Sequence, residues 1–398
     1  MLENKVLKQV QNNACTGCGA CLNACPKNAI SMQWDKYGFY KPVINAEKCI
    51  NCGLCENVCP LDKTFTQDIE PKVFALQIND EEQLYKSASG GAFAVFAKEI
   101  IRQGGTVYGV IYDNEMRVCH SRATTLGDLE KMYSSKYVQS DTKTTFKQAK
   151  EDLNNWKTVL FSGTPCQIAG LKSYLRKDYE NLITIDLVCH GTPSPLIFEK
   201  YKQEFMKNKP NETLLNVNFR SKKAGWGIHY LAHYTTTTTT LRDYHKPKDF
   251  WVYIMNYIFN TSCGNCKFNK KPRVADISIG DFWGVDEYDK SLNNNKGLSI
   301  LLINNEKGAK FLERVQDRCR LQEVPYDVAI KRNPNIKQSS IAEPNREQFL
   351  EDVCIKNLSL KKTAKRYLRV PLHIAIYRLL PQFAKDFIKY KILKREKI

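Results

Sequence analysis

The strongest constraint on this chain is a duplicated cysteine pattern within its first sixty residues. The first run reads CTGCGACLNACP from Cys15, and the second reads CINCGLCENVCP from Cys49. Each has the form C-x₂-C-x₂-C-x₃-C-P. Because a segment of about sixty residues cannot bury a large apolar core, we expect bound metal to hold it together.

This spacing is typical of bacterial two-cluster ferredoxins, in which three close thiolates bind one [4Fe-4S] cluster and the fourth cysteine binds the other. We therefore predict a ferredoxin domain over residues 6–62 that transfers single electrons. Its first cluster takes Cys15, Cys18, Cys21 and Cys59, and its second takes Cys49, Cys52, Cys55 and Cys25. Zinc is the alternative, but it prefers paired C-x₂-C knuckles to runs that end in Cys-Pro.

The cysteine count also bears on the compartment. Of 15 cysteines, eight lie between Cys15 and Cys59. We expect neither a secretory signal nor a transmembrane helix, because the chain starts without an apolar segment and has no apolar run of ~18 residues. A cytoplasmic location follows, and there such thiols bind metal or do redox chemistry.

The charge balance raises one further class of partner. Lys plus Arg is 60 against 42 Asp plus Glu, a formal charge of +18. The basic residues are dispersed and no nucleic-acid motif appears, so we expect no nucleic-acid partner.

The rest of the chain predicts a fold of the α+β/α/β class, with a mixed α/β body behind the ferredoxin domain. Strands are expected at 73–78 and 106–112, with a helix after Ser87 that has Ser89 as its N-cap. Two strand–loop–helix units follow, with strands at 158–162 and 182–188, which indicates a parallel sheet. The predicted boundaries are 72–155, 156–330 and a basic helical tail, 331–398.

Four further cysteines stand in loops. Cys166 and Cys189 directly follow predicted strands, and Cys263 and Cys266 form a C-x₂-C pair. Spacing alone leaves two interpretations open: a third [4Fe-4S] site, or ordinary buried thiols. A Cys166 nucleophile with His190 as its base is a further alternative. We expect Cys119, Cys319 and Cys354 to be ordinary thiols.

The loop at residues 87–91 is the best candidate for an anion site, because a helix N-terminus offers free N–H groups to phosphate. Simple helix capping is the plainer interpretation. The chain has neither G-x-G-x-x-G nor G-x-x-x-x-G-K-[ST], so it lacks the fingerprint of a Rossmann site or a P-loop.

Several motifs in one order carry a resemblance to a known family. They are SASGGAF (87–93), SSKYVQS (134–140), LFSGTPCQIAGL (160–171), DLVCHGTPSP (186–195), NFRSKKAGW (218–226), and CGNCKF with ADISIGDFWG (263–284). With these motifs the chain resembles the coenzyme F-420 hydrogenase/dehydrogenase beta-subunit family, in the form that carries an N-terminal two-cluster ferredoxin domain.

The resemblance implies a flavin-binding body that holds FAD, with FMN as the alternative, beside an iron–sulfur cluster. By position in the motifs, Ser89, Gly90 and Gly91 would approach the flavin, and Lys136, Tyr137 and Gln139 would lie near it. The four loop cysteines match the family's cysteine motifs, which favours the third cluster, with Asp281 as a neighbour or substitute ligand. Candidate contacts for an anionic substrate or partner, or else solvated surface charges, are Arg220, Lys222, Lys223, Lys270, Lys271 and Arg273.

The predicted function is that of an iron–sulfur flavoprotein oxidoreductase, which couples two-electron chemistry at the flavin to one-electron transfer through the clusters. Expected partners are an electron donor or acceptor protein, or a small carrier such as a deazaflavin, a flavin or a quinone. The alternative is a non-enzymatic electron-transfer subunit of a partner dehydrogenase. The basic tail predicts either peripheral contact with a membrane surface or a partner-facing helix, and a homo-oligomer is left open.

Overall fold

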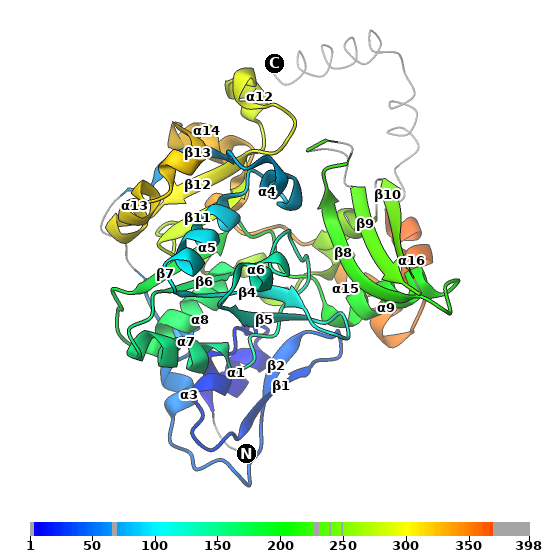
Figure 1. Cartoon of the computed structure of the whole chain (residues 1–398). Coiled ribbons are helices and arrows are strands. Elements are labelled where there is room, and N and C mark those ends of the chain that lie inside the picture. Colours follow the sequence, from blue (N-terminus) through cyan, green and yellow to red (C-terminus); the bar gives the residue numbers. More distant parts are fainter. Residues whose placement is uncertain are drawn as a thin grey trace, which may run out of the picture.

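The computed structural model describes residues 4–65, 70–223, 225–226, 231–238, 240–247 and 250–368. Figure 1 shows a small N-terminal segment below a central eight-stranded sheet, with a three-stranded sheet to one side. The mixed α/β body predicted from the sequence is confirmed.

The N-terminal segment has little regular structure and a small core. Its strands β1 and β2 pair antiparallel, with Ile30 opposite Ile44, and among its apolar residues Val6, Phe39 and Val58 are buried. The elements are α1 (Lys5–Gln11), α2 (Ala20–Ala24), β1 (Ile30–Trp34), β2 (Tyr40–Ile44), α3 (Leu54–Asn57) and the 3₁₀ turn η1 (Pro60–Asp62).

The central sheet has the strand order β13-β3-β12-β11-β7-β6-β4-β5. Strands β4, β6, β7 and β11 run parallel, as predicted for the strand–loop–helix units, and the others pair antiparallel. Both predicted segments, 72–155 and 156–330, contribute strands to this sheet. Its strands are β3 (Lys72–Ile78), β4 (Thr106–Tyr112), β5 (Val118–Ala123), β6 (Val159–Gly163), β7 (Leu182–Leu187), β11 (Ile277–Asp281), β12 (Ser299–Ile303) and β13 (Cys319–Glu323).

Helices cover both faces of the sheet. On one face Phe96 of α5 stacks on Phe311 of α13. On the other, α7 and α8 share an apolar cluster with Ala20 of the N-terminal segment, so this segment docks on that face. The helices and 3₁₀ turns are α4 (Glu81–Lys86), α5 (Ala92–Arg102), α6 (Leu126–Glu130), α7 (Thr145–Asn154), α8 (Pro165–Leu175), α12 (Val285–Tyr288), η3 (Lys290–Leu292), α13 (Glu306–Glu313), η4 (Gln316–Arg318) and α14 (Tyr326–Lys331).

The predicted capping of α5 is wrong. The helix begins at Ala92, and its N-cap is Gly91, whose φ of 87° lies in the left-handed region that favours glycine. The Ser89 hydroxyl instead donates a hydrogen bond to the Leu298 carbonyl oxygen at 2.7 Å.

The three-stranded sheet packs beside the central one on an aromatic core that includes Phe198, Phe219 and Trp251. The threonine-rich run ends β9 and begins the turn into β10, and Thr239 lies outside the described residues. The elements here are α9 (Pro195–Met206), β8 (Thr213–Ser221), β9 (Leu231–Thr237), β10 (Leu241–Pro247), α10 (Phe250–Tyr253), α11 (Met255–Ile258) and η2 (Thr261–Asn265).

The described part of the predicted tail closes the same core. It contains η5 (Pro334–Ile336), α15 (Arg346–Leu350), the π-helical turn η6 (Glu351–Ile355) and α16 (Leu360–Tyr367). The remainder of the predicted tail, from residue 369 on, lies outside the described residues. Across the part of the chain that is described, no helix is both long and apolar enough to cross a membrane.

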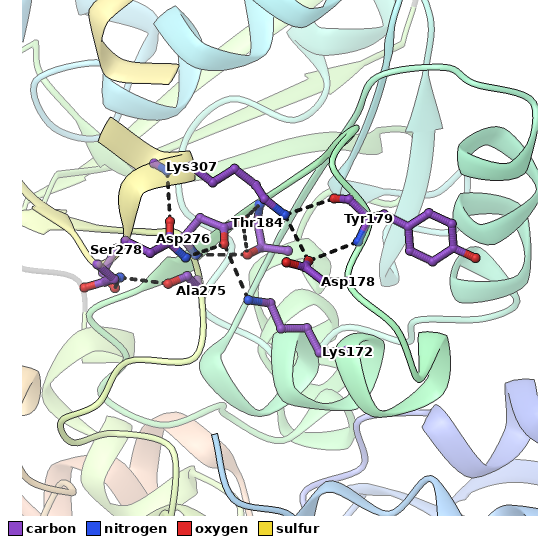
Figure 2. A network of polar contacts seen from close by, with 11 residues as sticks. Lys172, Asp178, Tyr179, Thr184, Ala275, Asp276, Ser278 and Lys307 are labelled. Carbon is purple, nitrogen blue, oxygen red and sulfur yellow. Dashed lines mark hydrogen bonds and ion pairs between the residues drawn. The ribbon is translucent and has the colours of Figure 1, made fainter. Parts of the chain in front are cut away.

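A buried carboxylate fixes the start of β11 against β7 and α8. Asp276 Oδ2 accepts hydrogen bonds from the amide and the hydroxyl of Thr184, both at 2.7 Å. Its Oδ1 accepts from Asn305 Nδ2 at 2.8 Å and lies 3.5 Å from Lys172 Nζ, and Figure 2 shows this network. Because β7 and β11 are held in register, the loops at their carboxyl ends meet at one edge of the sheet.

Candidate metal centres and cofactor cavity

The first cysteine set, Cys15, Cys18, Cys21 and Cys59, surrounds helix α2 and the start of η1. Burial raises the pKa of Cys18 to about 12, and the neighbouring Cys15 and Cys59 thiols add to the rise. Burial also raises the pKa of Cys21, with further contributions from Cys18 and Cys15. The structure therefore brings together the four cysteines that the spacing assigns to one cluster, including the distant Cys59.

The second cysteine set lines a common hollow. Cys25, Cys49, Cys52 and Cys55 are among the residues that line about 390 Å³ of space free of protein atoms, part of it open to solvent. Cys25 comes from the first sequence run and the other three from the second. This exchange is the one expected of a two-cluster segment.

The third cysteine set, Cys166, Cys189, Cys263 and Cys266, lines a hollow of nearly the same size, about 400 Å³. Cys166 lies in the first turn of α8, Cys189 follows β7, and the other two lie in and after η2. Thr16, between Cys15 and Cys18 in the chain, also lines this hollow, so the first and third sets are neighbours.

The spacing of the sulfurs bears on the zinc alternative. Within the described ranges, no group of three or more His, Cys, Asp or Glu side chains could hold a single metal ion. One zinc ion would draw four sulfurs to ~2.3 Å from one point, whereas a cubane is held through four separate irons and keeps its ligands farther apart. A cluster of this kind needs space between its four cysteines, and the second and third sets enclose such space.

The remaining cysteines stand apart from these hollows. Cys119 is buried, Cys319 donates to the Val315 carbonyl, and Cys354 donates to the Tyr37 carbonyl. Among residues in the described part of the chain, none of the three lines a cysteine hollow.

A larger cavity, here called the central cavity, opens at the carboxyl ends of the parallel strands. It holds about 1360 Å³ of space free of protein atoms, part of it open to solvent. Binding sites in α/β sheets gather at such strand ends. Most of the lining comes from five segments, 87–94, 132–140, 162–167, 187–192 and 279–283, each of which overlaps one of the motifs noted in the sequence.

One corner of the central cavity suits an anion. Helix α5 starts there at Ala92, after its N-cap Gly91, and no side chain caps its first N–H groups, so these amides and the helix dipole are available to a phosphate. Lys136 lines the same cavity, and its ammonium donates to the Tyr133 carbonyl at 2.8 Å. Lys222 donates to the Ser89 carbonyl in the adjacent loop.

A buried ion pair forms another wall. Arg220 Nη1 donates to Asp281 Oδ2 at 2.7 Å, and Arg220 also donates to the Tyr137 hydroxyl at 3.0 Å. Trp226 Nε1 donates to Asp281 Oδ1 at 3.2 Å. Asp281 lines the central cavity and not the third cysteine hollow, so its carboxylate serves as a partner of Arg220.

Several sequence candidates lie elsewhere. Gly90 packs under the loop, where a Cβ would lie 2.1 Å from the Leu76 carbonyl oxygen. The Gln139 side chain points away from the central cavity and bonds to the N-terminal segment, accepting from the Tyr40 amide at 2.8 Å and donating to the Thr16 carbonyl at 3.1 Å. His190 lines the central cavity, whereas Cys166 lines the third cysteine hollow, so the two members of the predicted nucleophile pair line different spaces.

Two of the basic residues predicted to contact an anion are already paired with carboxylates. Arg273 is buried and pairs with Asp186 at 2.7 Å, and Lys271 pairs with the exposed Glu70 at 2.6 Å. A wider open groove at the opposite edge of the sheet, beside Lys172 and Lys307, contacts none of the three cysteine sets.

Two threonines were missed as site residues. Thr192 lines both the central cavity and the third cysteine hollow, and Thr164 lines the central cavity while its hydroxyl contacts Cys166. Each lies two or three residues from a predicted ligand cysteine. That nearness was the available signal, since small polar residues beside a cluster ligand are natural partners for its sulfur.

Comparisons with known proteins agree with these features. Residues 156–328 match the family described as the C terminus of the beta subunit of coenzyme F420 hydrogenase/dehydrogenase, and residues 14–63 match the 4Fe-4S dicluster domain. The predicted resemblance is thus confirmed. A solved structure titled as the xenon derivatization of the F420-reducing [NiFe] hydrogenase complex from Methanosarcina barkeri shares 14% identity, covering 76% of this chain and 92% of that chain, with a TM-score of 0.42. No curated protein matches the chain.

Proposed function

Because the chain joins a 4Fe-4S dicluster domain to the C-terminal domain of coenzyme F420 hydrogenase/dehydrogenase beta subunits, we propose that it is an iron–sulfur flavoprotein oxidoreductase. The proposal adds a flavin, FAD or FMN, in the central cavity and a third [4Fe-4S] cluster on the third cysteine set. One observation carries it: Thr192 lines both spaces, so a group in the cavity would lie next to the third cysteine set.

The character of the central cavity supports a flavin. Its lining includes the small residues Gly109, Gly163 and Gly280 and the aromatic side chains of Phe93 and Trp283. Small residues leave room for a flat ring, and aromatic walls contact its faces. The uncapped start of α5 offers amides to a phosphate of the same molecule.

The cysteine sets continue from this cavity toward the surface. Thr16 joins the third set to the first, and the Cys21 thiol of the first set is close enough to Cys55 of the second for their charges to interact. In the second set Cys52 is exposed to solvent. When bound, a flavin would exchange two electrons with a substrate and the clusters would carry them singly.

The chain's own residues would orient the flavin and shield it. The Arg220–Asp281 pair has side chains 5% and 14% exposed. Arg220 donates a hydrogen bond to Tyr137, which lines the cavity, and Trp226 donates one to Asp281 from behind the lining. His190 lines the cavity, and its partial loss of hydration there lowers its pKa. It would therefore stand beside the bound ring as a group able to accept a proton.

The substrate class follows from the same proposal. A deazaflavin, a second flavin or a quinone has a flat conjugated ring that can exchange a hydride or two electrons with a bound flavin. The central cavity is open to solvent on one side, which leaves access for such a ring. The alternative, a non-enzymatic electron-transfer subunit, predicts no flavin and no turnover with any of these compounds.

Anaerobic purification with quantitation of iron, sulfide and flavin tests the proposal. We expect about twelve irons and one flavin per chain. The Cys263→Ser variant should retain about eight irons, because it removes a ligand of the third set only. Cys319→Ser is the matched control and should keep the full complement, since its sulfur contacts the Val315 carbonyl and no cysteine hollow. About eight irons with no flavin in the unaltered protein would refute the proposal.

A further inference from the structure

A buried lysine lies at the junction of the N-terminal segment and the body. Lys41 is on β2 and is 7% exposed. Its ammonium donates to the Cys15 carbonyl oxygen at 2.5 Å and to Asn260 Oδ1 at 3.1 Å. Both partners are neutral, and no carboxylate within the described residues forms an ion pair with it.

Such a charge needs an explanation. A buried ammonium loses its hydration, and neutral hydrogen-bond acceptors replace only part of it, so buried lysines normally pair with an anion. Asn260, which accepts a hydrogen bond from the lysine, is itself buried, and its Oδ1 also accepts a hydrogen bond from the Ser262 amide. The position of the ammonium is therefore well defined. The site therefore calls for a negative charge nearby that the side chains of Asp and Glu do not supply.

Two cysteine sets flank this ammonium. The ammonium bonds to the backbone carbonyl of Cys15 in the first set, and the Cys263 amide of the third set donates to the backbone carbonyl of Asn260 at 2.8 Å. Asn260 spans the gap, since it accepts from Lys41, lies next to η2, which carries Cys263, and approaches the Thr16 carbonyl at 3.5 Å. One positive charge thus acts on both sets.

We propose that Lys41 is the counter-charge shared by the first and third clusters, an inference that rests on the proposed function of both cysteine sets. A thiolate-bound [4Fe-4S] cluster is anionic and becomes more so on reduction, so a nearby fixed cation stabilises the reduced form more than the oxidised one. Lys41 therefore raises the reduction potentials of two neighbouring clusters together and keeps them matched for transfer between them.

A second buried cation provides a contrast. Arg346 is 5% exposed, donates to the Phe259 carbonyl oxygen, and has an Nε without a hydrogen-bond partner. The Phe259 carbonyl lies four residues before Cys263, so this hydrogen bond holds the Arg346 guanidinium beside the segment that carries the third set. Arg346 is electrostatically linked to the third set, whereas Lys41 is linked to the first and third, so the two residues predict different patterns of potential.

Redox titrations monitored by electron paramagnetic resonance, on the full-length reconstituted protein, test the proposal. In Lys41→Gln the equilibrium constant for reduction of the first cluster and that of the third should each fall about tenfold, which lowers each reduction potential by about 59 mV. The potential of the second cluster should not change. Lys41→Arg should restore both values. Arg346→Gln should shift the third cluster alone, and Lys36→Gln, which alters an exposed lysine of the same segment, should shift none.

Lys41→Met gives a second neutral side chain and should reproduce the shifts seen with glutamine. Unchanged potentials in a neutral variant with its full iron content would overturn the proposal, and so would equal shifts of all three clusters, which indicate a general loosening. Failure of the proposed function looks different, because the unaltered protein itself would then lack the iron and the signal of the third cluster.

Discussion

Gln139 tests whether the docking of the N-terminal segment can be separated from flavin binding. Its amide accepts from the Tyr40 N–H at 2.8 Å and donates to the Thr16 carbonyl at 3.1 Å, and it does not line the central cavity. The family resemblance implies a position near the flavin. The geometry instead predicts that Gln139→Ala loosens the segment and leaves flavin content unchanged.

The size of the effect follows from the groups left unpaired. Loss of the Gln139 side chain leaves the Tyr40 N–H without this acceptor. The Thr16 carbonyl still accepts a weak hydrogen bond from the Asn260 side-chain amide at 3.5 Å. An unsatisfied buried group costs ~1–3 kcal/mol and a simple hydrogen bond ~1 kcal/mol. The sum, ~2–4 kcal/mol, corresponds to a rise of ~30-fold to ~800-fold in the local opening constant.

Hydrogen exchange measured by mass spectrometry gives the opening constant directly. Peptides covering residues 15–18 and 38–42 should exchange faster in Gln139→Ala by this factor, while peptides from β6 and β7 should keep their wild-type rates. Gln103→Ala, at an exposed position after α5, is the control. Loss of flavin with unchanged exchange at residues 38–42 would refute the reasoning and return Gln139 to the cofactor site.

Two further predictions concern buried charges. Asp276→Asn should lower the thermal midpoint of unfolding by several degrees, because the new amide would place a donor against the Thr184 N–H, at a cost of ~2–4 kcal/mol. Asp178→Asn, at an exposed partner of Lys307, is the control and should change the midpoint little. Equal effects of the two variants would contradict the role of burial. Burial lowers the pKa of Lys222 to about 7 from 10.5, so between these values the unfolded chain binds more protons and the stability of the flavin-free protein should rise with pH. In Lys222→Met the plot of thermal midpoint against pH should be flatter over this pH range. Parallel plots for the variant and the unaltered protein would rule out the lowered pKa of Lys222.

The sequence was most informative where ligands are close in the chain. The ferredoxin pattern predicted which cysteines meet, because three cysteines of each set lie within one short run. The parallel strands also put Cys166 and Cys189 at one sheet edge, since both follow strands that pair directly, β6 and β7. Local spacing and strand order carry this information without any knowledge of distant contacts.

Other features depend on contacts that no local pattern reveals. The antiparallel strands β12, β3 and β13 extend the sheet through partners more than 200 residues apart, and Gln139 contacts residues 99 and 123 positions away. At the start of α5, propensity favoured Ser89 as the cap, but Gly91 adopts the left-handed conformation that begins the helix. Tertiary packing overrode the local preference there.

Helix α8 determines how the first and third cysteine sets are spaced. Cys166 lies in its first turn, and Gly170, four residues later, falls on the same face. A Cβ at Gly170 would lie 2.9 Å from the sulfur of Cys18, so any larger residue would displace the first set. One rigid helix therefore contributes a cysteine to the third set and the contact surface for the first.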